Sequence, residues 1–349
     1  MQHIGIDLHK RESQICWLDD ATGEVRQQRI QTRRDRFEAV LGHHAPGQAL
    51  IEAGTESEWV AQVVEGLGHR VWVVDPSYAP MYPRRRGGRH KNDPRDAAAL
   101  AEASLRGTYR PVHRVSRGRR VVREALTVRE ALVRTRTRLI ATLRAAVRAE
   151  GLRVVSGAAE GFAARLRAVA LPSDLAATVA PLLMVLDGLE AALAVADAQV
   201  AAHVAQDADM QRLQTAPRIG PVTSAAFVAA LDTPTRFAHA GQVVSYLGLA
   251  PRDDSSGDRR RAGHISKAGP SRIRWLLVQA GWGILCGPET QGWPLRTWAT
   301  ALAARRGKRI AAVALARRLA RILYAMWRDG TEFDRTAPRT TTAAGALAA

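Results

Sequence analysis

Three short stretches of the chain each place carboxylates where they could bind a metal ion. Asp7 ends the apolar part of residues 3–10, and Glu52 ends the apolar part of residues 48–54. Asp93 and Asp96 follow, three residues apart. A buried carboxylate is costly unless its charge is compensated. Since carboxylate oxygens are ligands that Mg²⁺ prefers, the four acids together predict a magnesium site.

Such a site suits the cleavage of phosphodiester bonds, because two metal ions about 3.5–4 Å apart stabilise both the attacking and the leaving oxygen. The acids also have ordinary structural explanations. Asp93 can cap a helix that begins with the following proline, and Asp96 fits its first turn. The same spacing nevertheless aims both carboxylates in one direction. Glu52 is a better strand-end ligand than Glu56 or Glu58, which fit the first turn of the next helix.

A pair of serines could supply a nucleophile. Ser255 and Ser256 lie in residues 253–258, a segment with the composition of a turn. Three arginines follow directly: Arg259, Arg260 and Arg261. The segment alone is ordinary turn sequence. The arginines favour a functional interpretation, because a serine on a flexible turn beside phosphate-binding side chains is placed to attack a phosphate.

Two basic stretches are predicted to contact nucleic acid. The first lies just before Asp93 and consists of Arg84, Arg85, Arg86, Arg89 and Lys91. The second consists of the arginines at 259–261 together with Lys267. Cationic side chains of this kind neutralise backbone phosphates. A solvated loop is the alternative for the first stretch, but its position beside the acids favours contact.

The first hundred residues contain the elements that must position the acids. Strands are predicted over residues 3–10, 13–19 and 24–32, a helix over 35–43, a strand over 49–53, a helix over 56–66 and a strand over 70–74. Short turns make the first three strands antiparallel, whereas helical connections make the later ones parallel. This α/β order is the ribonuclease H-like pattern, in which acids end the first and fourth strands and lie on a later helix.

Residues 115–206 are predicted to form a helical spacer or dimerisation arm. Apolar residues recur at steps of seven and then four within 123–150 and at steps of four and three within 182–204, which is typical of a coiled coil. The two helices could pair within one chain or between chains. A segment punctuated by Gly and Pro, residues 151–181, separates them.

Residues 207–332 are predicted to form a mainly helical C-terminal domain, and residues 333–349 a disordered tail. Residues 217–221 precede a helix and resemble the turn of helix-hairpin-helix modules, where backbone N–H groups hold phosphate. An ordinary joint between helices is the alternative. Residues 1–114 complete the predicted division as the metal-binding domain.

The composition favours a polyanionic partner. The 51 Lys and Arg residues exceed the 33 Asp and Glu residues, which gives a net charge of +18 and an isoelectric point near 11.2. A GC-rich genome would raise the arginine content without making the balance so positive. The two cysteines form neither a metal motif nor a disulfide framework. No signal peptide or membrane-spanning run is visible, so a soluble, cytoplasmic protein is expected.

Together these motifs resemble the DEDD transposases of insertion sequences, the family to which the Piv-type DNA invertases belong. The resemblance is carried by GIDLHK, IEAGTE and KNDPRDA, and by the distal PRIGPVTSAAF, YLGLAPRDDSSGD and GHISKAGPSRIRWLLVQAGW. The motifs follow the family's order over about residues 3–100 and 210–285. One departure is the turn after Glu52, where the family commonly has an aromatic residue and this chain has Trp59 later.

The resemblance implies a RuvC-like N-terminal domain that binds Mg²⁺ through Asp7, Glu52, Asp93 and Asp96. It implies a C-terminal transposase domain whose serine becomes covalently linked to DNA, a role that falls on Ser256, with Ser255 as the alternative. The family acts as an oligomer that combines one protomer's acids with another's serine, so a homo-dimer or tetramer is expected. Some members are guided by a structured non-coding RNA, which adds RNA to DNA among the expected partners.

Three functions follow as hypotheses. In the first, the protein is a site-specific recombinase in which Ser256 attacks a DNA phosphate. In the second, it is a metal-dependent nuclease of the Holliday-junction type, in which water attacks and Ser256 is only a turn residue. In the third, it is a non-enzymatic DNA-binding protein whose acids are helix caps and ion-pair partners.

Overall fold

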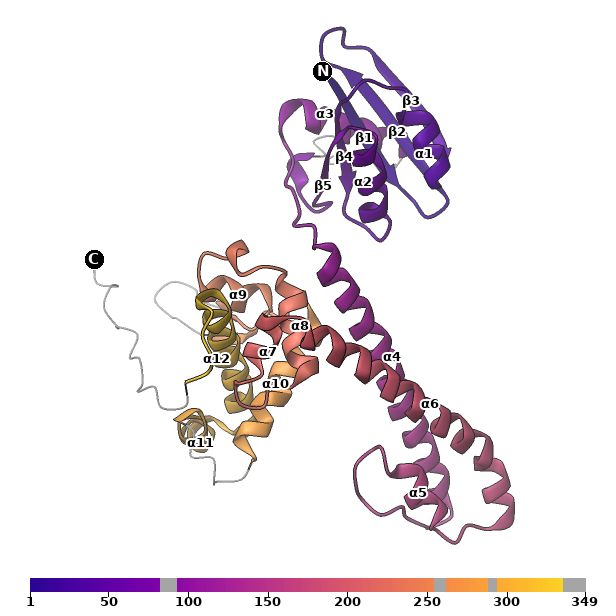
Figure 1. The fold of residues 1–349 in the computed structure, drawn as a ribbon, viewed down its shortest axis with the longest axis vertical. Helices are drawn as coiled ribbons and strands as arrows, with labels where there is room; N and C mark the ends of the chain where they lie inside the picture. Colours follow the sequence, from indigo (N-terminus) through magenta and orange to yellow (C-terminus); the bar gives the residue numbers. More distant parts are fainter. Residues whose placement is uncertain (82–92, 254–261, 288–293, 335–349) are drawn as a thin grey trace, which may run out of the picture. The chain divides into compact units, whose positions relative to one another are not determined.

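Figure 1 shows the fold in a computed structural model, which describes residues 1–81, 93–253, 262–287 and 294–334. The chain divides into two compact units, Met1–Val115 and Ser116–Ala349. The finer predicted division of the second unit, at residues 206/207 and 332/333, stays a prediction. Most of the predicted tail, from residue 335 onward, lies outside the described residues.

The core of the first unit is a mixed β-sheet. Within the described residues its strands are β1 (Gln2–Leu8), β2 (Glu12–Asp19), β3 (Val25–Gln31), β4 (Gln48–Glu52) and β5 (Arg70–Val74). They lie in the order β3-β2-β1-β4-β5. The first three strands are antiparallel neighbours, whereas β4 is parallel to β1 and β5 is parallel to β4. The predicted mixed α/β sheet is therefore confirmed.

Helices cover both faces of this sheet (Figure 1). They are α1 (Arg34–Leu41), α2 (Ser57–Gly66), the 3₁₀ helix η1 (Ala79–Met81) and α3 (Asp93–Arg106). On one face, Phe37 of α1 and Val60 of α2 share a buried cluster with Ile6. On the other face, Leu100 of α3 belongs to the same buried cluster as Leu50. Alternate residues of the central strands therefore face different helices.

The second unit begins with two long helices that pair along their length (Figure 1). They are α4 (Arg117–Ala149) and α6 (Ser173–Ala205), and the short helix α5 (Phe162–Arg167) lies between them in the chain. Ion pairs join Arg129 to Asp197 and Arg136 to Glu190 between the two helices, and Arg119 of α4 to Asp207, just after the end of α6. The partner number falls as the α4 number rises, which is the register of an antiparallel pair.

Both predicted helices of this arm are present, and both begin earlier than expected. α6 begins at Ser173 and continues through Pro181, which the prediction left in the separating segment. A proline removes one backbone hydrogen bond, and the buried side chains of α6 on either side of it, including Val179 and Leu186, still pack in one cluster. Whether the pair is a coiled coil in the strict sense stays a prediction. Among the described residues, α6 is also the one helix long and apolar enough to cross a membrane.

The rest of the second unit is a body of shorter elements. These are α7 (Ala208–Leu213), α8 (Pro221–Leu231), η3 (Pro234–Arg236), α9 (Ala240–Tyr246), β6 (Pro251–Asp253), β7 (Ala262–Ile265), α10 (Ser271–Leu285), α11 (Pro294–Arg306) and α12 (Lys308–Asp329). α8 is buried from Thr223 to Leu231, and its Phe227 packs edge-on against Trp327 of α12. The body is therefore organised around α8 and α12.

The beginning and the end of this body are joined by hydrogen bonds. Trp327 Nε1, near the end of α12, donates to Asp209 Oδ2 in α7 at 2.8 Å. The Phe333 backbone N–H donates to Thr215 Oγ1 at 2.9 Å. The chain therefore leaves the body beside the place where it entered.

Candidate functional site

Asp7 and Glu52 end two neighbouring strands at one edge of the sheet. β1 and β4 are parallel, with Ile6 opposite Ile51, so the next residues in register are Asp7 and Glu52. Asp7 is 4% exposed, and Glu52 is half-buried. The carboxylates therefore lie at the carboxyl ends of adjacent parallel strands.

Both side chains belong to the face of the sheet that α3 covers. His3 Nδ1 on β1 lies 2.8 Å from Ser104 Oγ of α3. Gln48 Nε2 on β4 donates to the same hydroxyl at 3.0 Å. Since every second residue of a strand points the same way, Asp7 and Glu52, each four residues further on, share this face.

The direction of α3 brings its first turn toward Asp7. Ser104, near the end of α3, lies beside His3, and Ala97 lies beside Gly5. Two strand residues advance by about 6.6 Å, which equals four to five residues of helix. The next step along β1, from Gly5 to Asp7, therefore leads to the beginning of α3.

The acids at the beginning of α3 are Asp93 and Asp96. Asp96 is 5% exposed, whereas the Asp93 side chain lies outside the described parts of the structure. On the facing strand, Asp7 Oδ2 lies 3.4 Å from His9 Nε2, so a protonated His9 would form an ion pair with it. Two buried carboxylates on packed elements are costly to hold without compensating charge.

The close packing of α3 against β1 depends on Gly5. A Cβ atom at this position would lie 1.9 Å from the carbonyl oxygen of Ala97 and 2.6 Å from the backbone nitrogen of Ala101. Any side chain here would push α3 away from the sheet. Gly5 therefore sets the distance between the strand acids and the helix acids.

The competing acids near Glu52 have other partners. Glu56 accepts a hydrogen bond from a tryptophan N–H. Glu58 binds Arg114 at 2.9 Å, and Arg114 also binds Glu65. The pKa of the Arg114 guanidinium is raised, most by its hydrogen bond to Glu65 and next by its hydrogen bond to Glu58. By its position, Glu52 is the acid of this stretch that ends β4 at the acidic edge.

The donor set is chemically suited to a hard divalent cation, since all four predicted ligands are carboxylates. Within the described residues, however, no group of three or more His, Cys, Asp or Glu side chains is arranged to hold a metal ion. The predicted set also needs Asp93, whose side chain is not among them. Cys16 adds no ligand, because burial raises the pKa of its thiol to about 11.

The predicted nucleophile and most predicted nucleic-acid contacts lie outside the described residues. They are Ser256, its alternative Ser255, Arg84, Arg85, Arg86, Arg89, Lys91, Arg259, Arg260 and Arg261. Lys267 is described and exposed. Its φ of 56° is left-handed, and its N–H donates to the Gly248 carbonyl oxygen at 3.1 Å.

The serine segment connects two short antiparallel strands. Pro251 of β6 lies opposite Ile265 of β7, and Asp253 lies opposite Ala262. The sequence predicted a turn here without its flanking strands. Strands of three and four residues are too short for alternation to be visible in a sequence.

The predicted phosphate-binding turn before α8 contains a left-handed residue, Arg218, with a φ of 60°. Gly220 then precedes the helix, which begins at Pro221. The Arg218 side chain lies against α10 and its end, since a Cβ atom on Gly287 would lie 2.7 Å from Arg218 Nη2. In this structure Arg218 therefore packs against its own body.

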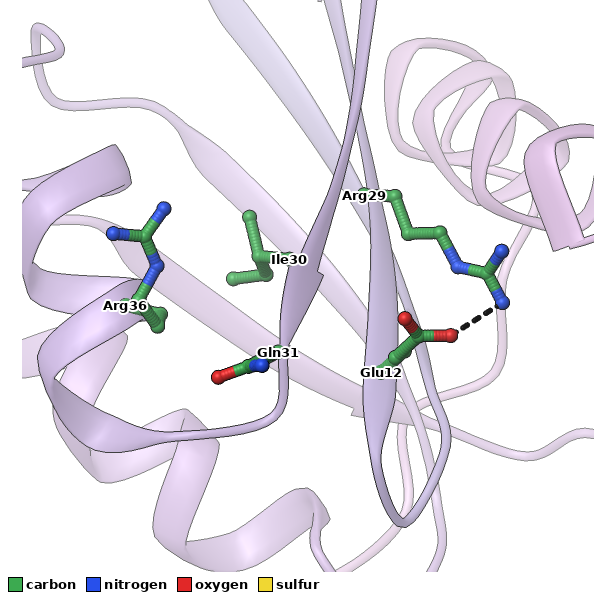
Figure 2. A pocket seen from close by; sticks show the side chains of 5 residues that line it. All are labelled: Glu12, Arg29, Ile30, Gln31 and Arg36. Carbon is green, nitrogen blue, oxygen red and sulfur yellow. Dashed lines mark ion pairs between the residues drawn. The ribbon is translucent and has the colours of Figure 1, made fainter.

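A shallow pocket of about 430 Å³ lies along β2 and β3 (Figure 2). It is lined by Glu12, Arg29, Ile30, Gln31 and Arg36. Arg29 and Glu12 form an ion pair at 2.6 Å. Arg29 is in register with Gln14, which is in register with Asp7, so the pocket lies at the acidic end of the sheet. Sequence reasoning missed it because arginines on a polar edge strand are typical of a solvated surface.

Comparison with known proteins gives a consistent result. A family model described as "Transposase IS116/IS110/IS902 family" matches residues 210–291, and a second model described as "Transposase" matches residues 4–150. The first match includes the serine segment, and the second includes all four predicted acids.

Similar proteins extend over nearly the whole chain. A "Probable family 20 transposase" of Pseudomonas aeruginosa is 32% identical over 93% of this chain and 96% of its own length. The transposase for insertion sequence element IS1111A of Coxiella burnetii is 28% identical over 93% of this chain and 88% of its own. The transposase for insertion sequence element IS1328 of Yersinia enterocolitica is 27% identical over 95% of this chain and 98% of its own length. The chain therefore belongs to the IS116/IS110/IS902 family of insertion-sequence transposases.

Proposed function

We propose that this transposase cuts and rejoins DNA through a covalent phosphoserine intermediate, with Ser256 as the nucleophile. Asp7, Glu52, Asp93 and Asp96 would bind the divalent metal ion, Mg²⁺. The observation that carries this proposal is the meeting of two strand ends and one helix start at a single edge of the sheet. A carboxylate metal site needs this kind of convergence.

The proposal makes the first unit a ribonuclease H/RuvC-like domain. Three antiparallel strands followed by two parallel strands support this fold. The acids at the ends of β1 and β4 and at the start of α3 support it as well. In the second unit, the antiparallel α4–α6 pair serves as the coiled-coil arm, and the turn before α8 as the helix-hairpin-helix-like element.

The acids act by being held in fixed positions. Asp7 and Asp96 are buried between packed elements, so their carboxylates are oriented before DNA binds. Bound Mg²⁺ would stabilise the attacking and leaving oxygens of the phosphate. His9 Nε2 lies 3.4 Å from Asp7 Oδ2 at this edge.

The serine step conserves the energy of the DNA bond. Ser256 Oγ forms a bond to phosphorus, loses its proton to a nearby base, and displaces one DNA oxygen, which leaves as a hydroxyl group. One phosphate ester replaces another, so a DNA hydroxyl can later displace the serine without ATP. The arginines at 259–261 are expected to bind the phosphate during this exchange.

The proposed partners are the element's ends, a target DNA, a structured non-coding guide RNA and further copies of the chain in the cytoplasm. The outer side of α6 supports self-association. Met184, Gly188, Ala191 and Val195 recur there at steps of four and three, and all are exposed. They form a second seam of apolar and small residues that α4 does not cover.

A covalent-trapping assay tests this function. Purified protein is mixed with Mg²⁺ and supercoiled DNA that carries the gene's own flanking sequences, with and without transcripts of those flanks. The mixture is denatured, and DNA-linked protein is sought on a gel. An adduct that is lost in Ser256→Ala and in Asp7→Ala is the expected result.

Other outcomes separate the alternatives. An adduct that persists in both Ser256→Ala and Ser255→Ala contradicts the serine assignment. Cleavage that gives free ends without an adduct, and that is lost only in Asp7→Ala, identifies a nuclease that uses water. Salt-sensitive DNA binding that is indifferent to Mg²⁺ and to Asp7→Ala, with no cleavage, identifies a non-enzymatic DNA-binding protein.

A further inference from the structure

The C-terminal body carries a basic surface that the proposed site does not use. Residues 259–328 contain fifteen Lys and Arg residues and one acidic residue, Glu289. Fifteen minus one leaves fourteen positive charges, out of +18 for the whole chain. The positive charge of this transposase is therefore concentrated in one stretch of about seventy residues.

The fold itself uses part of this charge. Arg272 pairs with Glu130, Arg328 with Asp329, Arg274 with the Leu247 carbonyl oxygen, and Arg318 with the ring of Trp298. These side chains have structural roles, so they cannot be counted as a binding surface.

Six other cations have no such partner among the residues that the structure describes. All six are exposed, and none forms an ion pair with any residue that the structure describes. They are Arg305, Arg306, Lys308, Arg309, Arg317 and Arg321, which together are named here the basic α11–α12 surface. Because α11 and α12 have no acid before Asp329, neighbouring side chains on these helices do not neutralise them.

The core of the body holds this surface outward. Gly307 alone joins the two helices and has a left-handed φ of 85°, so the cations on either side of it come together at one tip. Leu315, Leu319 and Leu323 of α12 are buried. The opposite side of the same helix carries Arg317 and, one turn later, Arg321, which therefore point away from the core.

The tip formed by residues 305–309 carries more positive charge than the two helix dipoles stabilise. Arg305 and Arg306 lie in the last turn of α11, where the helix dipole stabilises cations. Lys308 and Arg309 lie in the first turn of α12, where the dipole opposes them, and no acid shares that turn. An external polyanion would relieve this repulsion, whereas folding alone gives no reason for it.

The aromatic residues of these helices are not available for base stacking. Tyr324 and Trp327 are buried, and the guanidinium of Arg318 covers the ring of Trp298 at 5.0 Å. Proteins that bind single strands stack bases on exposed aromatic rings, and sequence-specific RNA binders do the same. A surface with cations alone fits the backbone of a duplex.

We propose that the basic α11–α12 surface binds the phosphate backbone of duplex DNA independently of its sequence. Arg309, Arg317 and Arg321 lie on one broad side of α12 and span about 18 Å of helix, the length of about five base pairs. The surface lies beyond residues 4–150 and 210–291, which the family models match. The proposal rests on the proposed function only in taking DNA as the substrate, and it requires neither the serine nor the metal.

The test is DNA binding by a variant with Arg305, Arg306, Lys308 and Arg309 all changed to Gln. Affinity of the full chain for a fluorescent random-sequence duplex is measured over a series of KCl concentrations, in EDTA, so that no cleavage occurs. The slope of log K against log salt should fall by about 3 to 4, because each lost phosphate contact lowers it by about 0.9. A second variant, Arg317→Gln with Arg321→Gln, should lower it by about half as much.

A matched control removes four charges elsewhere. Arg26, Arg34, Arg106 and Arg110 are exposed, and each pairs with a neighbouring acid. Their change to Gln should leave the slope nearly unaltered. Thermal unfolding of every variant should match that of wild type, because no altered side chain is buried.

Three results for the variants would overturn the proposal. They are an unchanged salt slope in both surface variants, and an equal fall of the slope in the control. The third comes from a parallel titration with a structured RNA of the same length, if the surface variants lose affinity only for that RNA. Wild-type protein that does not bind duplex DNA would overturn it as well. If the adduct persists in both Ser256→Ala and Ser255→Ala while the surface variants lose DNA affinity, the phosphoserine mechanism fails and this surface stands.

Discussion

The acidic edge of the first unit and the basic surface of the second hold their charges in opposite ways. Asp7 and Asp96 are buried, and their places depend on strand register and on the packing of α3. The six cations of the basic α11–α12 surface are exposed and depend on little beyond their own helix. Buried, packed groups act as a unit, whereas separated surface groups contribute almost independently. The acidic edge should therefore fail in one step, and the basic surface by degrees.

The largest expected effect is that of Asp7→Asn. The change keeps the shape of the side chain and removes its charge, so DNA cleavage should fall by about 10²- to 10³-fold, while affinity for DNA stays near that of wild type. The rate of adduct formation measures the loss of cleavage, and equilibrium binding measures the affinity for DNA. Glu102→Gln on α3 is the control, because Glu102 pairs with the exposed Arg106. Equal losses in the two variants would contradict the assignment of Asp7.

Gly5→Ala should be the next most damaging change. The new methyl group would overlap the Ala97 carbonyl oxygen, so α3 must move, and overpacking of this kind costs about 1–3 kcal/mol of unfolding free energy. Cleavage should be lost with it, since the helix acids move away from the strand acids. Denaturant unfolding and the trapping assay measure both effects.

Gly66→Ala is the matched control for that change. Nothing lies within 4 Å of a Cβ atom at Gly66, so this variant should keep wild-type stability and activity. A Gly5→Ala protein that cleaves DNA normally would show that the acidic edge tolerates displacement of α3, and would weaken the contrast between the two regions.

The acidic edge could be predicted because its signals are local. Asp7 and Glu52 each end a run of buried residues, and the antiparallel or parallel direction of the strands follows from whether a turn or a helix connects them. Gly5 could not be assigned its role, since the backbone atoms that it admits lie more than ninety residues later, at Ala97 and Ala101. Sequence shows that a glycine is present, but not what approaches it.

The basic α11–α12 surface was missed for a different reason. Lys and Arg make up 51 of 349 residues, so the six on these two helices do not stand out from the rest of the sequence. Only burial and pairing separate Arg317, which is exposed, from its neighbour Arg318, which lies on Trp298. Prediction of such a surface needs the partners of every cation, and these depend on tertiary packing.

An intermediate effect is expected on the outer side of α6. Val195→Arg should weaken self-association by about tenfold or more, because the seam would bring like charges together. Val195 is 60% exposed, so the stability of the protomer should not change. Sedimentation over a range of concentrations measures this. Ala176→Arg, an exposed change outside the seam, is the control, and an equal effect there would argue against the seam.

The smallest effect concerns pH and His3. Burial lowers the pKa of His3 below its usual 6.5, so the unfolded chain binds a proton more readily than the folded chain. This contribution to stability is present above pH 6.5 and is lost as the pH falls toward the lower, folded pKa. His3→Gln, which can keep a hydrogen bond to Ser104, should flatten the dependence of unfolding free energy on pH in this window. An identical slope in both proteins would exclude His3 as the cause.

The hydrogen bonds from Trp327 and Phe333 to α7 have a consequence for how this body could be rearranged. Because its entry and exit lie together, its ends could be joined by a short linker and the chain reopened at an exposed turn, giving a circular permutant. The same closure makes residues 208–333 suitable for exchange between transposases as one cassette. A graft onto another α4–α6 arm would also need to reproduce the packing of Val122 and Leu126 of α4 and of Val204 of α6 in the core of this body.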